Sequence, residues 1–215
     1  MGIQLWGAFG GFRKKTGALI GKWLNGQNVI TPLPHPSEAP PTASQLLVRN
    51  KFALVVKWQS WISPIIRVGW QNAHEEKQTA FNAAFAYNYR NAVVLNAGTP
   101  ELDYSKIMLA KGRLSNGFMV TLATTTDAQL DFSWGATIEN KIGGPTDLLT
   151  VVVYNPAKDR YATAVDAAPR SALSYDMAVP ANWGGDIVYP WVFFVSADGK
   201  LNSTSEFLAP TEVQG

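Results

Sequence analysis

The sequence predicts an α+β chain whose C-terminal half is an antiparallel β-sandwich. Three observations lead to this prediction. The first 41 residues are rich in glycine and proline, the next segment has apolar residues at helical spacing, and from Asp103 onward apolar residues alternate with period two. With 215 residues, 47% hydrophobic and 16% charged, the chain is long and apolar enough for a real core. We predict three parts: residues 1–41, a helical hairpin over 42–98, and a sandwich with its leading strand over 99–215.

The N-terminal segment is predicted to be an extended docking arm. Residues 1–30 hold seven of the eighteen glycines, interleaved with bulky apolar side chains. Glycine loses much backbone entropy on ordering, so such a segment rarely folds alone, yet its bulky residues need burial. We therefore expect the arm to be ordered by docking on the rest of the chain or on a neighbouring subunit.

A proline-rich spacer follows the arm. Residues 31–41 contain five prolines, and a polyproline II segment of this length spans roughly 30 Å at about 3.1 Å per residue. His35 lies inside this spacer, where we expect it to be exposed to solvent.

Two helices are predicted after the spacer. The residues Thr42-Ala-Ser-Gln45 fit a capping box, and apolar residues then recur near helical spacing as far as Trp58. This helix should end by Ser63, because Pro64 disfavours the helical conformation in the residue before it. A second helix is predicted from about Gln78 to Val94.

The tryptophans of these regions are predicted to be core residues. Trp58, Trp61 and Trp70 should pack between the helices rather than line a ligand site. Trp134 follows Leu130 and Phe132 in strict alternation, which places it on the apolar face of an early strand of the sandwich.

The period-two region predicts seven strands. They are expected at residues 104–110, 118–123, 130–134, 148–154, 173–179, 187–196 and 200–208. Turn residues separate them, and Asp198-Gly199 is predicted to form a two-residue type I′ hairpin turn. This many short strands without intervening helices is typical of an immunoglobulin- or fibronectin III-like sandwich.

Charge is distributed unevenly along the chain. The first 70 residues carry eight Lys or Arg and one acid, whereas the remainder carries ten bases and fifteen acids. A chain polarised in this way can attract an anionic partner or pair with copies of itself. The candidate assembly or anion contacts are Trp6, Phe12, Arg13, Lys14, Lys15, Lys22 and Trp23. Aromatic and basic side chains together can also bind nucleic acid, although no known nucleic-acid-binding signature accompanies them.

The composition excludes several kinds of chemistry. The chain has no cysteine and two histidines, His35 and His74, which excludes disulfides and thiolate metal sites and argues against polyhistidine sites. It has no Gly-x-Ser-x-Gly elbow, and Gly17 to Trp23 lacks the spacing and the hydroxyl residue of a phosphate-binding loop. We expect no catalytic residue, no cofactor, no metal and no enzymatic activity.

The location of the protein is predicted from two further features. No apolar run approaches the roughly 20 residues that span a bilayer. The residues before Arg13 lack the positive region of a signal peptide, so synthesis in the cytoplasm without export is expected.

Several short motifs resemble a known family along nearly the full chain. They are Gly10-Gly11-Phe12, Gly21-Lys22-Trp23, Arg49 to Leu54, Leu102 to Lys106, Phe132-Ser133-Trp134 and Val153 to Lys158. Together they are similar to an uncharacterised family of Bacteroidota proteins of about this length, with a glycine-rich N-terminus. Because the family has no known function, the resemblance supplies no site residues. It implies a non-exported protein without an enzyme signature, found near mobile or phage-like genes.

The preferred hypothesis is a self-assembling structural protein, such as a component of a phage or phage-derived particle, that contacts its neighbours through the N-terminal arm. A first alternative is a binding module whose sandwich recognises surface glycan or protein. A second is a nucleic-acid-associated protein that uses the basic N-terminal part. Oligomer size separates the first hypothesis from the first alternative, and salt-dependent retention on DNA identifies the second.

Overall fold

A computed structural model describes residues 2–3, 13–35, 39–138 and 142–215 of the protein. The chain divides into two compact units, Met1–Gln45 and Leu46–Gly215. The second unit contains the helical region together with all the strands that follow it. The finer division at residues 41 and 98 stays a prediction.

The first unit contains antiparallel strands in the order β1-β4-β3-β2. Their bounds are Gly2–Ile3 (β1), Lys14–Thr16 (β2), Leu19–Leu24 (β3) and Gln27–Pro32 (β4). The prediction of an extended arm is therefore wrong for these residues. The chain reverses because Asn25 and Gly26, between the paired residues Leu24 and Gln27, both adopt positive φ angles, of 48° and 76°. Such a two-residue turn closes a hairpin.

The first long helix begins at the predicted capping box. In α1 (Ala43–Ser60) the Thr42 backbone N–H donates to Gln45 Oε1 at 3.0 Å, and the Gln45 N–H donates to Thr42 Oγ1 at 3.3 Å. This reciprocal pair confirms the predicted start of the helix. His35, in the connector before it, is exposed as predicted.

Two shorter helices follow, one of which was not predicted. They are α2 (Ser63–Gly69) and α3 (Ala80–Asn91). Pro64 lies in the first turn of α2 instead of only ending α1, because proline is tolerated there, where its missing N–H is not needed. The α3 helix lies within the predicted range, and the Gln59 side chain of α1 donates to the Phe81 carbonyl of α3 at 2.9 Å.

The strand predicted over residues 104–110 does not form. A two-stranded hairpin, β5 (Val93–Asn96) and β6 (Thr99–Leu102), precedes a 3₁₀ turn at Tyr104–Lys106. The Asp103 carboxylate accepts from the Ser105 N–H and starts that turn. The chain beyond it is held by the Asn88 side chain, which hydrogen-bonds both the N–H and the carbonyl of Met108.

The C-terminal region forms two packed antiparallel sheets, which confirms the predicted sandwich. One sheet has the order β10-β9-β12-β13 with β14 also paired to β12, and the other has the order β11-β8-β7. The strands are Phe118–Ala123 (β7), Gln129–Gly135 (β8), Leu148–Asn155 (β9), Arg160–Ala164 (β10), Ser174–Ala178 (β11), Ile187–Val195 (β12), Glu206–Phe207 (β13) and Thr211–Glu212 (β14).

Details of the last predicted strands differ from the structure. The strand predicted over residues 200–208 is reduced to β13, and β10 and β14 were not predicted. The turn at Asp198-Gly199 is longer than a type I′ turn. Only Gly199 has a positive φ angle, and the Ser196 N–H pairs with the Leu201 carbonyl around a larger loop.

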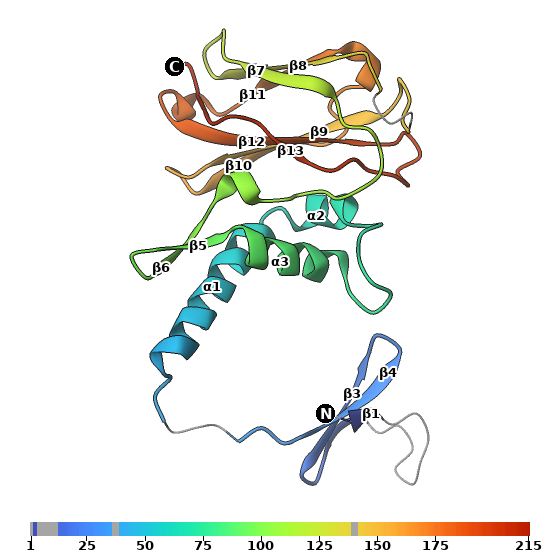
Figure 1. Ribbon diagram of the computed structural model, residues 1–215, viewed down its shortest axis with the longest axis vertical. Coiled ribbons are helices and arrows are strands. Elements are labelled where there is room, and N and C mark those ends of the chain that lie inside the picture. Colours follow the sequence, from blue (N-terminus) through green and yellow to red (C-terminus); the bar gives the residue numbers. More distant parts are fainter. Residues whose placement is uncertain (1, 4–12, 36–38, 139–141) are drawn as a thin grey trace. The chain divides into compact units, whose positions relative to one another are not determined.

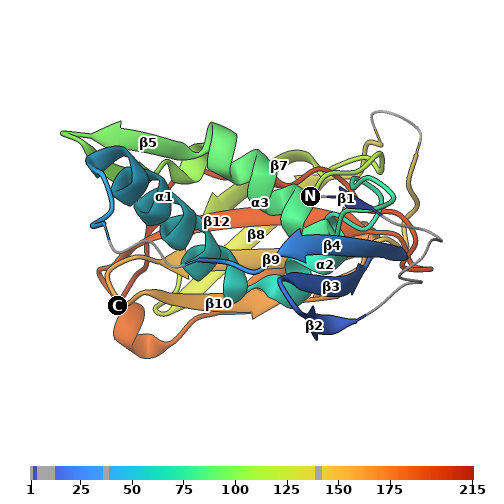
Figure 2. The same cartoon turned by 90° about the horizontal axis from the view of Figure 1, so that it is seen from below.

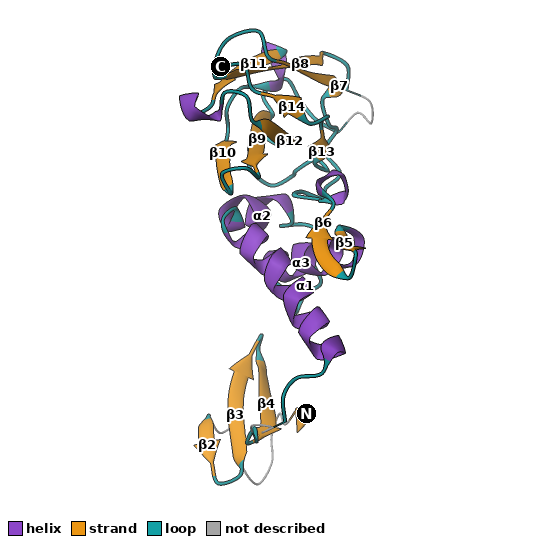
Figure 3. Cartoon of the chain, turned by 90° about the vertical axis from the view of Figure 1, so that its left-hand side faces the viewer, coloured by secondary structure: helices purple, strands orange, loops and turns teal. Residues whose placement is uncertain are grey.

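The second unit has three layers, with the five-stranded sheet in the middle (Figure 1). Alternate residues of β9 face opposite layers: Leu149 and Val151 pack with Phe132 of the other sheet, whereas Val152 packs with the helices. The helical side is seen in Figure 2, where the helices lie over β9, β10 and β12. Figure 3 shows the helical layer edge-on against the strands. None of the described helices is long and apolar enough to cross a membrane.

The tryptophan predictions hold with one exception. Trp58, Trp70 and Trp134 are buried, as predicted. Trp61 is 63% exposed, and the prediction of a core role for it is wrong. Trp61 lies in the link between α1 and α2, where the chain changes direction. Its side chain therefore lies outside the face of the helices that packs on the sheet.

Three segments of the second unit are in close backbone contact. The Asn202 side chain donates to the Gly69 carbonyl at the end of α2, and that carbonyl also accepts from the Lys111 N–H. Gly112 has no room for a side chain, because a Cβ there would lie 1.7 Å from the Asn202 carbonyl oxygen. The helical layer is therefore joined directly to the loop that follows β12.

Candidate binding groove

The predicted contact residues of the N-terminus do not form one site in the described structure. Trp6 and Phe12 lie outside the described residues. Arg13 lies 5.8 Å from the ring centroid of Trp23, which is 54% exposed. Strand pairing places Lys14 and Trp23 on one face of the sheet and Lys15 and Lys22 on the other. Their role as assembly or anion contacts stays a prediction.

A groove is present in the second unit, where α2 passes over the end of the five-stranded sheet. It consists of two neighbouring hollows of about 310 and 350 Å³, which share Pro64, Ile65 and Val165 as lining residues. We call the first the inner hollow and the second the outer hollow. The inner hollow reaches β9 and β12, and the outer hollow lies against β10. No motif in the sequence points to this groove.

The chain path after β10 explains why Val165 lies between the hollows. Asp166 has a positive φ angle of 53°, so the chain turns there, and the Ala167 N–H donates back to the Leu149 carbonyl at 2.9 Å. Val165 is left before this turn with 57% of its surface exposed. An apolar side chain in that position is available to a partner.

Asp159 lines the outer hollow and is held by two polar side chains that lie beside that hollow. Lys57 and the Tyr154 hydroxyl each contact the Asp159 carboxylate, at 2.8 and 2.9 Å. The Lys57 hydrogen bond, followed by that of Tyr154, holds the pKa of Asp159 below its usual value. Burial raises the pKa values of Tyr154 and Tyr161, so both phenols are neutral at physiological pH. The Asp159 carboxylate is therefore used by Lys57 and Tyr154, and the Tyr161 hydroxyl donates to the Trp58 carbonyl, an arrangement that suits a rigid wall.

The inner hollow is mainly apolar, although Thr150, Gln71, Asp166 and Ser196 also line it. Its walls are formed by side chains of α2 and of the sheet: Pro64, Ile65, Val68, Leu148, Phe193 and Val195. Thr150 of β9 also lines it and is buried, and its Oγ1 has no hydrogen-bond partner among the described atoms. Such a hollow can bind a mainly apolar group.

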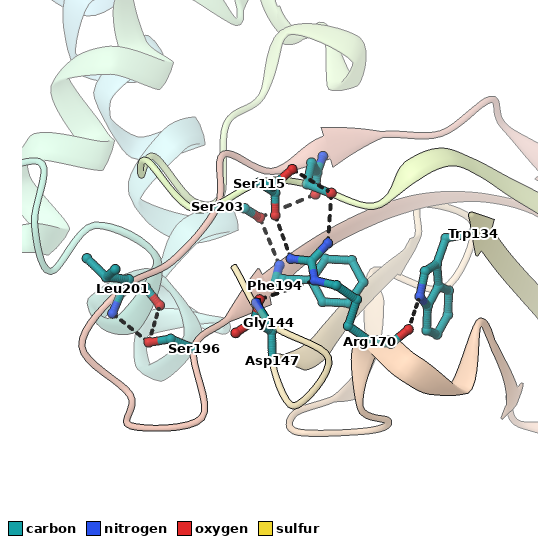
Figure 4. A network of polar contacts seen from close by, with 10 residues as sticks. Ser115, Trp134, Gly144, Asp147, Arg170, Phe194, Ser196, Leu201 and Ser203 are labelled. Carbon is teal, nitrogen blue, oxygen red and sulfur yellow. Dashed lines mark hydrogen bonds and ion pairs between the residues drawn. The ribbon is translucent and has the colours of Figure 1, made fainter. Parts of the chain in front are cut away.

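The sandwich contains a second polar cluster, around Arg170 (Figure 4). The buried Arg170 side chain pairs with Asp147 at 3.2 Å and donates to the carbonyls of Asn116 and Ser115 at 2.8 and 2.6 Å. Its guanidinium carbon lies 4.0 Å from the ring centroid of Phe194. Burial lowers the pKa of Arg170, while Asp147 opposes that effect. Because its donors are used within the protein, this cluster joins loops and is not a binding site.

Apart from residue type, nothing in the sequence indicates either the groove or the Arg170 cluster. Arg170 and Asp147 are 23 positions apart, and no motif links them. The groove residues come from α2, β9, β10 and β12, so they meet only through the topology of the sheet.

Comparison with known proteins identifies a family without a known role. A family model described as "Family of unknown function (DUF6266)" matches residues 11–209. The solved structure of the fn3 domain of human collagen alpha-1(XX) chain is similar at 16% identity and a TM-score of 0.36, over 49% of this chain and 89% of that domain. A likeness at this level carries no argument about function. No curated protein matches the chain.

Proposed function

The chain belongs to the DUF6266 family of unknown function, and on that basis we propose that it is a non-enzymatic binding module whose groove takes an extended peptide segment of a partner protein. The membership is consistent with the family resemblance seen in the sequence, whereas a Bacteroidota source stays a prediction. The observation that carries the proposal is the position of the apolar groove beside β10, the terminal strand of its sheet.

An extended segment suits this position because of how strands pair. Among the described strands, β10 is paired with β9 alone. A peptide strand added at the outer edge of β10 would gain main-chain hydrogen bonds, while alternate side chains would point toward the helical layer. Tyr161 and Thr163 of β10 point that way, since they pair with Tyr154 and Val152, which face the helices. The hollows lie on this same side.

The exposed apolar residues of the groove support the same reading. Trp61 and Val165 are 63% and 57% exposed, and both line the outer hollow. Large aromatic side chains often dominate the binding energy of an interface, because they bury much area at a low cost in conformational entropy. Trp61 is therefore the expected anchor of the outer hollow.

A variant of Val165 tests the proposed function. A library of random twelve-residue peptides is selected against the full chain, and the peptides that bind are measured against Val165→Glu. We expect affinity to fall at least tenfold, because the substitution places a charge between the two hollows. Val48→Glu is the matched control, since Val48 is a valine on α1 with 55% exposure, and it should bind as the wild type does.

Hydrogen exchange provides the second readout for these peptides. Bound peptides should slow exchange in the amides of Arg160–Ala164, since a new strand would use the free edge. Failure to select any peptide, or peptides that tolerate Val165→Glu, would remove the proposal. Loss of binding in Val48→Glu instead would place the site on α1.

A second candidate function is self-assembly through the N-terminal unit. Trp23 and Leu24 are more than half exposed there, near the basic residues Arg13, Lys14 and Lys15. The acidic excess after residue 70 gives a second copy a surface of opposite charge. In this proposal the protein is part of an assembled particle, such as that of a phage, and an anionic nucleic acid would be an alternative partner.

Sizing tests the second candidate. Light scattering should report an oligomer for the wild type and a smaller species for Trp23→Ser with Leu24→Ser. The exposed pair Val48→Ser and Leu95→Ser, which lies in the other unit, is the control. A wild-type monomer at high protein concentration and low salt would contradict self-assembly.

A further inference from the structure

Thr150 is the starting point for an inference about what enters the inner hollow. Its side chain is 2% exposed, and its hydroxyl has no hydrogen-bond partner among the described atoms. A buried hydroxyl without a partner loses its hydrogen bonds to water and gains nothing in return. Each such group in a folded protein therefore calls for an explanation, and a ligand atom is one.

The surroundings of Thr150 restrict the chemistry of that ligand. Thr150 pairs with Phe193 of β12, and most of the remaining walls are aliphatic side chains and the ring of Pro64, with Gln71 and Ser196 also in the lining. The lining side chains carry one charge, that of the Asp166 carboxylate. Asp166, at the exposed part of the lining, would repel an anion. The hollow favours an apolar group with one neutral polar atom at its end.

We propose that the inner hollow is a specificity pocket for a hydroxylated aromatic group, which among protein side chains is that of tyrosine. Its ring would pack against Phe193 and the aliphatic walls, and its hydroxyl would hydrogen-bond to Thr150 Oγ1. The volume of about 310 Å³ is at the lower end for ligand sites and is sufficient for one ring. The proposed function enters only in the identification of the group as a peptide side chain.

The register of an added strand makes the inference more specific. Side chains on one face of a strand are separated by an even number of residues. Both hollows lie on the helix-facing side of the sheet. Selected peptides should therefore place their tyrosine and their second apolar anchor two or four residues apart.

Two small probes test the pocket in the full chain without a peptide. The probes are 4-methylphenol and toluene, which differ by one hydroxyl, and their binding is followed by NMR shifts of the Thr150, Phe193 and Val195 amides. We expect 4-methylphenol to bind about five- to tenfold more tightly, in line with one net hydrogen bond. In Thr150→Val, which has nearly the same shape, this preference should disappear.

Two further variants keep the test decisive. Thr150→Ser retains the hydroxyl and should retain the preference, and it replaces the valine variant as evidence if that variant does not fold. Thr163→Val removes an exposed hydroxyl from the outer hollow and should leave the preference unchanged. Equal binding of the two probes to the wild type, shifts elsewhere in the chain, or a preference that survives Thr150→Val would overturn the inference.

The outcome is separable from that of the proposed function. If 4-methylphenol binds with the expected preference and no peptide is selected, the pocket stands and the peptide-binding proposal fails. If peptides bind in a Val165-dependent manner but contain no preferred tyrosine, the groove stands and the specificity inference fails.

Discussion

Trp134 contributes to the sandwich through both its ring and its indole N–H. The ring lies edge-on to Phe194 at 5.6 Å between centroids, inside the core between the two sheets. The N–H donates to the Arg170 carbonyl at 2.8 Å. A buried tryptophan with its polar atom satisfied combines large apolar burial with a fixed orientation.

Replacing this side chain tests the assignment of the core. Trp134→Ala should lower the free energy of unfolding by about 3–5 kcal/mol, because it leaves a cavity and removes the hydrogen bond. Trp61→Ala, at an exposed position, should change it by less than about 0.5 kcal/mol. Urea denaturation of both variants measures the two values. If both variants lowered the free energy of unfolding equally, the assignment of Trp134 to the core face of its strand would be wrong.

The ion pair of Arg170 and Asp147 can be tested by removing one partner or both. Asp147→Ala leaves a buried cation without its counter-charge and should cost about 3–5 kcal/mol of stability. The double variant Asp147→Leu with Arg170→Met should be more stable than Asp147→Ala, since no charge remains buried. Urea denaturation of the double variant and of the single variants Asp147→Leu and Arg170→Met completes a double-mutant cycle and gives the coupling energy. If the double variant were the least stable protein, the packing of the arginine stem would outweigh its charge.

At the scale of elements, the regular strands were predictable from alternation alone. The strand Phe118–Ala123 was predicted with the observed bounds, and β9 and β12 differ from prediction by one residue. The missed strand β10 has the sequence Arg-Tyr-Ala-Thr-Ala. Alanine is a poor strand former, so the pattern of this strand is weak. Its place in the sheet comes from pairing with β9.

The hairpin of β3 and β4, which was not predicted, has a local signal in the sequence, whereas the groove has none. Asn25-Gly26 is the residue pair preferred in type I′ turns, and it alone would have corrected the extended arm. The groove instead depends on β10 being the terminal strand and on the position of α2 over the end of the sheet. Neither property is encoded in residues close together in the sequence.

The capping box of α1 provides a prediction for one element. Thr42→Ala removes the side chain that accepts from Gln45 and should destabilise the first turn by about 0.5–2 kcal/mol. Amide exchange of Gln45 should become faster, while exchange near Val55 stays unchanged. Ser44→Ala, which alters an exposed neighbouring hydroxyl, is the control. The capping role is wrong if both variants exchange alike.

For the whole molecule, acid should be destabilising. Hydrogen bonds or ion pairs lower the pKa of five aspartates: Asp103, Asp131, Asp159, Asp186 and Asp198. Because these pKa values are lower in the folded state, the associated stability is present above about pH 4, the unfolded value, and is lost as the pH falls further. Melting temperatures between pH 6 and pH 2.5 measure this loss, and a constant melting temperature would contradict it.

The division into two compact units gives a second prediction at this scale. Deleting residues 1–41 retains Thr42 and the whole of Leu46–Gly215. The shortened protein should melt within a few degrees of the wild type, since the described residues of its core clusters all lie from Trp58 onward. Circular dichroism gives the comparison. A shortened chain that does not fold would show that the sandwich needs the N-terminal unit.

The close backbone contact at Gly69, Gly112 and Asn202 determines how fast a partner can enter the groove. Because α2 is attached to the loop after β12 by direct hydrogen bonds, the two walls of the inner hollow cannot separate without breaking them. The groove is preorganised, so a ligand does not wait for an opening step. Observed association rates should therefore rise linearly with ligand concentration, without the plateau that conformational gating produces. Gly112→Ala, which forces the contact apart, should introduce that plateau.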